Sequence, residues 1–139
     1  MNARRSMDAT GGPRRPEEFR LVLSPDRRAG RRAREALRQR FAEALPPQTL
    51  VDLTAVVTEL VNNAVAHGPG KPITVALVAG DELIRGEVID QGNPAAAIPE
   101  MQKSGQGDAH GLVVVDKLTS RWAVYEGSTH VWFEMPIES

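Results

Sequence analysis

The chain has 139 residues, a formal net charge of −1 and no cysteine, with 41% hydrophobic and 25% charged residues. These values are typical of one globular domain, and they exclude a disulfide framework and a thiolate metal site. The sequence shows neither an apolar run of about 18 residues nor a signal peptide, so we expect a cytoplasmic protein that does not cross a membrane.

The first segment combines an irregular tail with a short strand. Residues 1–16 are rich in Arg, Gly and Pro and have no periodicity, which predicts a disordered tail before a domain spanning residues 17–139. Apolar and polar residues alternate from Phe19 to Leu23, which predicts a strand at the edge of a sheet.

A helix is expected next, from about Asp26 to Leu45. Ser24 is placed to act as its N-cap, and Pro25 occupies the first helical position. Its apolar residues recur every four positions, and arginines occupy the other faces: Arg27, Arg28, Arg31, Arg32, Arg34 and Arg38. No aromatic residues lie between these arginines, so we expect a solvated or partner-facing surface and no nucleic acid.

The second predicted helix runs from about Gln48 to His67 and has the clearest 3,4 apolar spacing in the chain, with Gly68 as its C′ glycine. Glu59 and Asn63 are four residues apart, so both point to the same side of this helix. Such a pair is often only a polar stripe. It can also hold a hard cation and orient a hydroxyl group.

Two strands follow, over residues 73–79 and 83–90, joined by a turn at Gly80-Asp81. The period of two places Ile84, Val88 and Asp90 on the side of the pleat that faces the core. A buried carboxylate is costly without a partner, so Asp90 marks either a structural anchor or a ligand site.

Residues 91–110 contain glycines and prolines without periodicity, and we interpret them as a lid over a site. A helix from His110 to Leu118 and a hairpin of strands over residues 121–126 and 130–135 complete the chain. Trp122 and Trp132 are expected to pack against the sheet or shield its edge.

This order of elements predicts an α/β fold. We expect a mixed sheet that is mostly antiparallel, because short turns join several of its strands. The helices are expected to share one face of this sheet in a two-layer α/β sandwich.

Four motifs occur in an order typical of one family. They are Glu59-Leu60-Val61-Asn62-Asn63-Ala64, Asp90-Gln91-Gly92, Gly111-Leu112-Val113-Val114-Val115 and Val131-Trp132-Phe133-Glu134-Met135-Pro136. With these motifs the chain, from about Phe19 to Pro136, resembles the GHKL or Bergerat-fold ATPases, and among them the bacterial anti-sigma-factor serine/threonine kinases. The domain over residues 17–139 is accordingly expected to be a histidine kinase-like ATP-binding domain.

The resemblance implies ATP and Mg²⁺ as cofactors. Asp90 would accept a hydrogen bond from the adenine amino group, and Gly92 would let the backbone approach the base. Asn63 would be the Mg²⁺ ligand and Glu59 the general base. The remaining implied nucleotide contacts are Gly107, His110, Gly111 and Leu112, which would surround the phosphates, and His130, which stands where the family often has an adenine-binding threonine.

The chain departs from the family pattern near the base and the phosphates. Pro94 stands where a second glycine often follows Gly92, and Ala109-His110-Gly111 replaces a Gly-x-Gly. The function implied by the resemblance is a homodimeric regulator that binds a sigma factor and phosphorylates a serine of an anti-sigma-factor antagonist.

The main alternative is an ATP-binding module of the same fold with little catalysis, which sequesters a partner. The arginines of the first helix, or the surface around Trp122 or Trp132, would then carry the function. A histidine kinase fragment and a nucleic-acid binder are weaker alternatives.

Overall fold

The computed structural model of the chain describes residues 17–90, 112–125 and 130–137. The elements in these ranges are β1 (Glu17–Leu23), α1 (Ala29–Phe41), α2 (Pro47–His67), β2 (Ile73–Ala79), β3 (Leu83–Ile89), α3 (Val113–Leu118), β4 (Arg121–Val124) and β5 (Val131–Pro136). Their order matches the predicted order. The tail predicted over residues 1–16 and the lid predicted over residues 91–110 lie outside the described residues.

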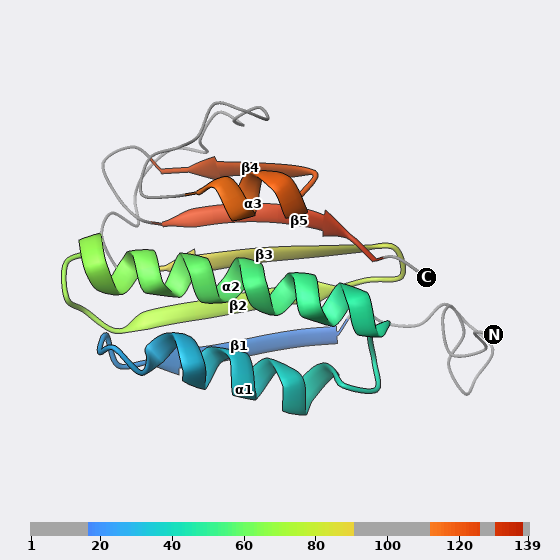
Figure 1. Ribbon diagram of the computed structural model, residues 1–139, viewed down its shortest axis with the longest axis horizontal. Coiled ribbons are helices and arrows are strands. Elements are labelled where there is room, and N and C mark those ends of the chain that lie inside the picture. Colours follow the sequence, from blue (N-terminus) through green and yellow to red (C-terminus); the bar gives the residue numbers. More distant parts are fainter. Residues whose placement is uncertain (1–16, 91–111, 126–129, 138–139) are drawn as a thin grey trace.

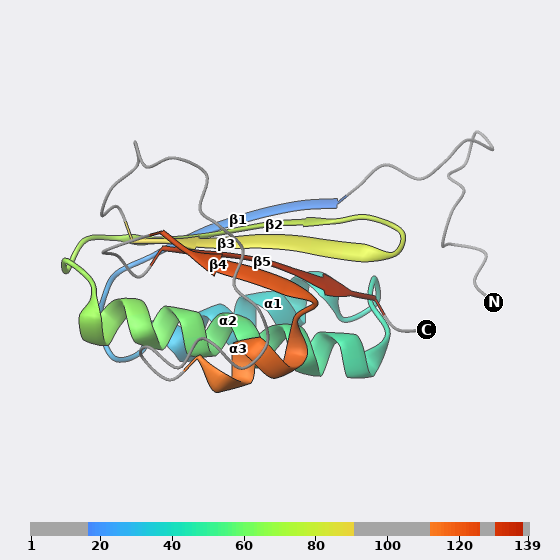
Figure 2. The same ribbon diagram turned by 90° about the horizontal axis from the view of Figure 1, so that it is seen from above.

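The strands form one sheet in the order β1-β2-β3-β5-β4, and all neighbouring strands are antiparallel. All three helices lie on one face of this sheet (Figure 2), which confirms the two-layer α/β sandwich. β1 is an edge strand, as predicted. The sheet was expected to be mixed, but every described pairing is antiparallel. We call the face that none of the described helices covers the open face.

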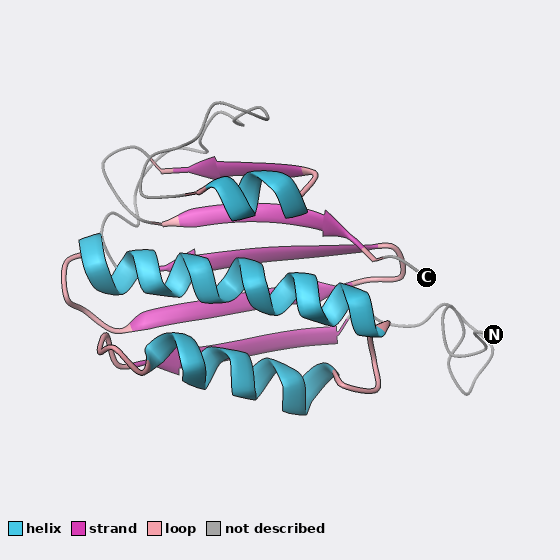
Figure 3. Ribbon diagram, viewed as in Figure 1, coloured by secondary structure: helices cyan, strands magenta, loops and turns pink. Residues whose placement is uncertain are grey.

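α2 is the central helix of the helical layer, between α1 and α3 (Figures 1 and 3). Its 21 residues have a mean hydropathy of 1.2 over an 18-residue window, so by length and composition it alone among the described helices could cross a membrane. Half of that window is buried inside the fold. The apolar residues at the 3,4 positions of α2 therefore form the centre of the core, as expected for an amphipathic helix packed on a sheet.

α1 begins three residues later than predicted because Asp26 forms a turn of its own. Its Oδ1 accepts a hydrogen bond from the backbone N–H of Arg28 at 2.8 Å, and the carboxylate also pairs with Arg32 at 3.2 Å. The hydrogen bond from the Arg28 backbone is the main reason that the pKa of Asp26 lies below its usual value. Short polar side chains often compete with the helix for backbone groups in this way.

The end of α2 also differs in detail from the prediction. Gly68 is extended, with φ −85° and ψ −176°, although its N–H still donates to the carbonyl of Ala64 at 2.9 Å. The left-handed residue is Gly70, with φ 79°. The left-handed turn that glycine permits therefore comes two residues after Gly68.

The two tryptophans lie on opposite faces of the sheet. Trp122 is 2% exposed in the core, and its indole N–H donates to Asp116 Oδ1 at 2.9 Å, which links β4 to α3. Trp132 lies on the open face, beneath the guanidinium groups of Arg85 and Arg121.

Gly86 of β3 lies where the core leaves no room for a side chain. It points towards the helices, and Phe133 of β5 and Leu77 of β2 fill the space that a Cβ atom would need. Neither neighbour can withdraw easily, since both side chains are themselves buried.

We predict that Gly86→Ala lowers the free energy of unfolding by about 1–3 kcal/mol, the usual cost of overpacking a core. Urea denaturation measures this difference. Gly80→Ala is the matched control, because the nearest atom to its added Cβ, the carbonyl oxygen of Leu83, would lie at 3.6 Å, an ordinary contact. Equal stability of Gly86→Ala and the wild type would contradict this account of the core.

Candidate functional site

The end of β3, the last turns of α2 and the start of α3 lie at the same end of the molecule (Figure 1, left). The residues predicted for the site and described by the structure on the helix side at this end are Glu59, Asn63, Asp90 and Leu112. Gly92, Gly107, His110 and Gly111 lie outside the described residues. The structure therefore shows the part of the predicted site formed by helix α2 and strand β3.

Asp90 directly follows β3 and is 1% exposed. Val88 and Ile84 of the same strand are in the core, so the alternation along the pleat places Asp90 on the helix side of the sheet. The position agrees with the prediction that this carboxylate lies on the buried side. A carboxylate held there is a fixed hydrogen-bond acceptor in largely apolar surroundings.

Asn63 is also buried, at 8% exposure, in the last two turns of α2. Its Nδ2 atom is inaccessible to solvent and has no hydrogen-bond partner among the described residues. An unsatisfied buried amide costs about 1–3 kcal/mol, and few such groups occur in native proteins. Because the two ends of the amide can exchange places by a flip, Asn63 can offer either its oxygen or its nitrogen to a bound group.

Glu59 is half-buried, one helical turn before Asn63 on the same side of α2. Within the described ranges, no three His, Asp or Glu side chains cluster closely enough to hold a metal ion by themselves. A cation bound beside Asn63 would thus take most of its ligands from a bound molecule and from water.

Leu112 contributes through packing. Its side chain is 2% exposed and belongs to the core, and its carbonyl accepts the N–H of Asp116 at 2.9 Å where α3 begins. Only its backbone could contact a ligand at this end of the sheet.

The structure does not bring His130 together with Asp90 and Asn63. Its ring contacts Glu87 Oε2 at 2.6 Å through Nε2 and stacks on Tyr125 with ring centroids 4.0 Å apart. Val131 and Val88, the chain neighbours of His130 and Glu87, point into the core, so these two residues point to the open face. Burial, together with the charge of Glu87, raises the pKa of Tyr125 above its usual value.

The open face also carries a charged network that was not predicted from the sequence. The carboxylate of Glu134, only 7% exposed, accepts hydrogen bonds from Arg85 at 3.0 and 3.2 Å and lies 3.6 Å from Arg121. These residues come from β5, β3 and β4. The alternation of polar residues in each strand indicates that these three side chains lie on the same face of the sheet. Which of them form ion pairs depends on the order of the strands, which the alternation does not give.

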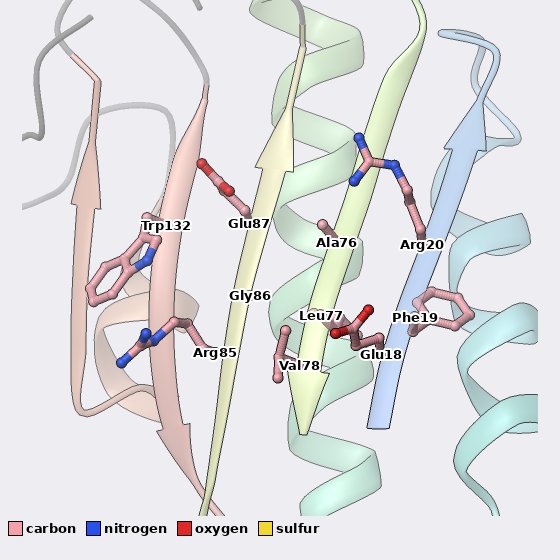
Figure 4. A pocket seen from close by; sticks show the side chains of 10 residues that line it. All are labelled: Glu18, Phe19, Arg20, Ala76, Leu77, Val78, Arg85, Gly86, Glu87 and Trp132. Carbon is pink, nitrogen blue, oxygen red and sulfur yellow. The ribbon is translucent and has the colours of Figure 1, made fainter. Parts of the chain in front are cut away.

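A hollow of about 430 Å³ lies beside this network (Figure 4). Its walls are charged side chains of β1 and β3 together with Trp132, and its floor includes Ala76 and Val78 of β2. It is thus separated from Asp90 by the sheet itself.

Comparisons with known proteins agree with this fold. The family profile described as the histidine kinase-like ATPase domain matches residues 23–135. No curated protein matches the chain. Among solved structures, the RsbU and RsbW domains of Rv1364c from Mycobacterium tuberculosis superpose with a TM-score of 0.61 at 22% sequence identity, over 92% of this chain and 33% of that one.

That structure shares the fold, and this chain spans about a third of its length. The profile match covers most of the 139 residues. It includes α2, which carries Glu59 and Asn63, and β3, which directly precedes Asp90. The chain belongs to the histidine kinase-like ATPase domain family.

Proposed function

We propose that the chain binds Mg-ATP on the helix side of the sheet, at the end where β3 meets α2, and transfers the γ-phosphoryl group to a serine of a partner protein. The observation that carries this proposal is the unsatisfied buried amide of Asn63, one turn after Glu59. Together with the buried Asp90, it supplies polar groups suited to a nucleotide within a family of ATPase-like domains.

Asp90 is suited to select the base. Its carboxylate can accept a hydrogen bond from the exocyclic amino group of adenine, while a base with a carbonyl at that position would bring two acceptors together. A site built to hydrogen-bond an amino group of its ligand discriminates strongly against an analogue that lacks it.

Asn63 is suited to hold the metal. Mg²⁺ prefers oxygen ligands and usually keeps several waters and phosphate oxygens in its shell, so one amide oxygen is an adequate protein contribution. When bound, Mg-ATP supplies the phosphoryl group and the positive charge that neutralises its oxygens.

Glu59 is suited to take the proton from the serine hydroxyl. It is half-buried and lies on the same side of α2 as Asn63, so it can orient a hydroxyl group near the metal site. The remaining work of the chain is positioning, which supplies much of the catalysis in phosphoryl transfer.

The proposed partners are a sigma factor, which the protein would hold in the cytoplasm, and the antagonist that carries the serine. A module that only sequesters a partner is the second candidate, and α1 favours it. Arginines at 3,4 spacing form one stripe on this helix, without an ion pair among the described residues: Arg31, Arg34 and Arg38. A row of unpaired cations suits an acidic partner surface.

Mg-ATP is expected to raise the melting temperature of the wild type, because a ligand at about 100 times its Kd stabilises the native state by about 2.7 kcal/mol. For a domain of this size that is roughly 5–10 °C. Asp90→Asn should lose most of the shift. Differential scanning fluorimetry measures both, with the exposed Asp81→Asn as control and circular dichroism to verify that each variant is folded. A wild type without any shift would sink the nucleotide proposal.

Glu59→Gln is expected to keep the Mg-ATP melting shift but to slow phosphate transfer to a cognate antagonist by about 10²–10⁴-fold, the range for loss of a general base. Phosphate-affinity electrophoresis of the antagonist measures the rate, with the exposed Glu43→Gln as the matched control. If the wild type transfers no phosphate to any candidate antagonist, the kinase proposal fails and sequestration stands. A Glu59→Gln variant at the full rate would instead remove Glu59 from the mechanism.

A further inference from the structure

The strand that leads to Asp90 is tied to its neighbour on the open face as well as in the core. Glu87 lies three residues before Asp90 in β3, and its Oε2 atom is 2.6 Å from Nε2 of His130. In Figure 4 the carboxylate of Glu87 points towards β5. His130 directly precedes β5, so this contact joins the last part of β3 to the start of the adjacent strand.

His130 is also held by the end of β4. The backbone N–H of Tyr125 donates to the His130 carbonyl at 3.0 Å, and the two rings stack with their centroids 4.0 Å apart. His130 is only 6% exposed, so its ring has little freedom to leave Glu87. An ionised carboxylate can only accept hydrogen bonds, and Nε2 is therefore the donor in this contact when Glu87 is ionised.

The described pairing of β3 with β5 ends two residues before Asp90. Val88 with Val131 is the last described residue pair between these strands. On the other side of β3, the last described pair is Ile89 with Thr74 of β2. The contact between Glu87 and His130 therefore reinforces β3 on its β5 side, at the point where the described backbone pairing on that side stops.

We propose that Glu87 and His130 are positioning residues for Asp90, an inference that rests on the proposed nucleotide site. Their side chains lie on the open face, whereas Asp90 points to the helix side, so they act on it through the backbone of β3. By holding the end of β3 against β5, they fix the place of the Asp90 carboxylate. A hydrogen bond to one amino group tolerates little displacement of its acceptor, because it weakens steeply with distance and angle.

A second contact on the open face provides an internal comparison. Arg85 also ties β3 to β5, through hydrogen bonds of 3.0 and 3.2 Å to Glu134. Arg85 lies five residues before Asp90, and Glu87 lies three residues before it. At about 3.3 Å per residue, the two contacts are roughly 17 and 10 Å from Asp90 along the strand. A contact that only stabilised the sheet would affect the nucleotide site equally from either place, whereas a positioning contact acts from the nearer one.

Isothermal titration calorimetry of the full chain with Mg-ATP and with Mg-GTP tests the proposal. Glu87→Ala should raise the dissociation constant for Mg-ATP about tenfold, the lower end of the range for losing a supporting contact behind a metal ligand. The constant for Mg-GTP should change much less, because guanine has a carbonyl where adenine offers its amino group to Asp90. A loss of folded protein alone would weaken the binding of both nucleotides equally.

Two matched variants serve as controls, with circular dichroism to verify that each is folded. Glu87→Gln keeps an oxygen that accepts the Nε2–H bond, so it should bind Mg-ATP as the wild type does. Arg85→Ala removes the more distant contact and should also leave the dissociation constant unchanged. An unchanged constant in Glu87→Ala, or an equal rise in Arg85→Ala, would overturn the proposal. A wild type that binds no Mg-ATP would overturn the proposed function itself, and the positioning role with it.

A double variant tests whether His130 acts through Glu87. His130→Phe keeps an aromatic ring that can stack on Tyr125 but removes the hydrogen bond, so it should raise the dissociation constant for Mg-ATP by the same factor as Glu87→Ala. The combined variant should bind no more weakly than either single variant, because both substitutions remove the same contact. Losses that add up in the combined variant would show that His130 acts by another route and would contradict the proposal.

Discussion

α2 lies across the centre of the sheet and is in contact with β2, β3 and β5 as well as with α1 and α3. One apolar face of this helix is therefore buried against the strands, and the other elements take their places around it. The same packing forces any polar side chain on its buried sides to find a partner or to carry an energetic cost. The buried Nδ2 atom of Asn63 has no hydrogen-bond partner among the described residues, and this links the packing of the fold to its proposed function.

The face of each element could be predicted from the sequence because local periodicity determines it. The 3,4 spacing of α2 placed Glu59 and Asn63 on one side, and the alternation along β3 placed Asp90 on the helix side. Helix ends were less predictable: Asp26 diverts the start of α1 through a single hydrogen bond to the Arg28 backbone, which no periodicity reveals. The predicted phosphate-binding residues lie outside the described part of the chain.

Contacts between strands could not be predicted, because they depend on sheet order. β3 pairs with β5, which lies more than 40 residues further along the chain, and this pairing brings His130 to Glu87 and Arg85 to Glu134. The family resemblance implied that His130 contacts the nucleotide, but the pleat turns its side chain to the open face. If a strand shifts its register by one residue, every side chain moves to the other face of the sheet. The position of a residue in a motif near a hairpin therefore predicts poorly which face its side chain is on.

The sheet thus separates two surfaces with different chemistry. The helix side carries the buried polar side chains of Asn63 and Asp90 at one end of the sheet, and we propose that they bind a small ligand. The open face carries charged side chains around a small apolar floor. Asp90 and Glu87 thus lie on opposite sides of the sheet, at or next to the end of β3.

The most direct test of the nucleotide site is a ¹H–¹⁵N correlation spectrum recorded with and without Mg²⁺ and a non-hydrolysable ATP analogue. The side-chain amide signals of Asn63, identified by their absence in Asn63→Leu, should shift strongly when the analogue binds. The indole signal of Trp132 on the open face should stay in place. A shift of the Trp132 signal while the Asn63 signals remain unmoved would contradict the account.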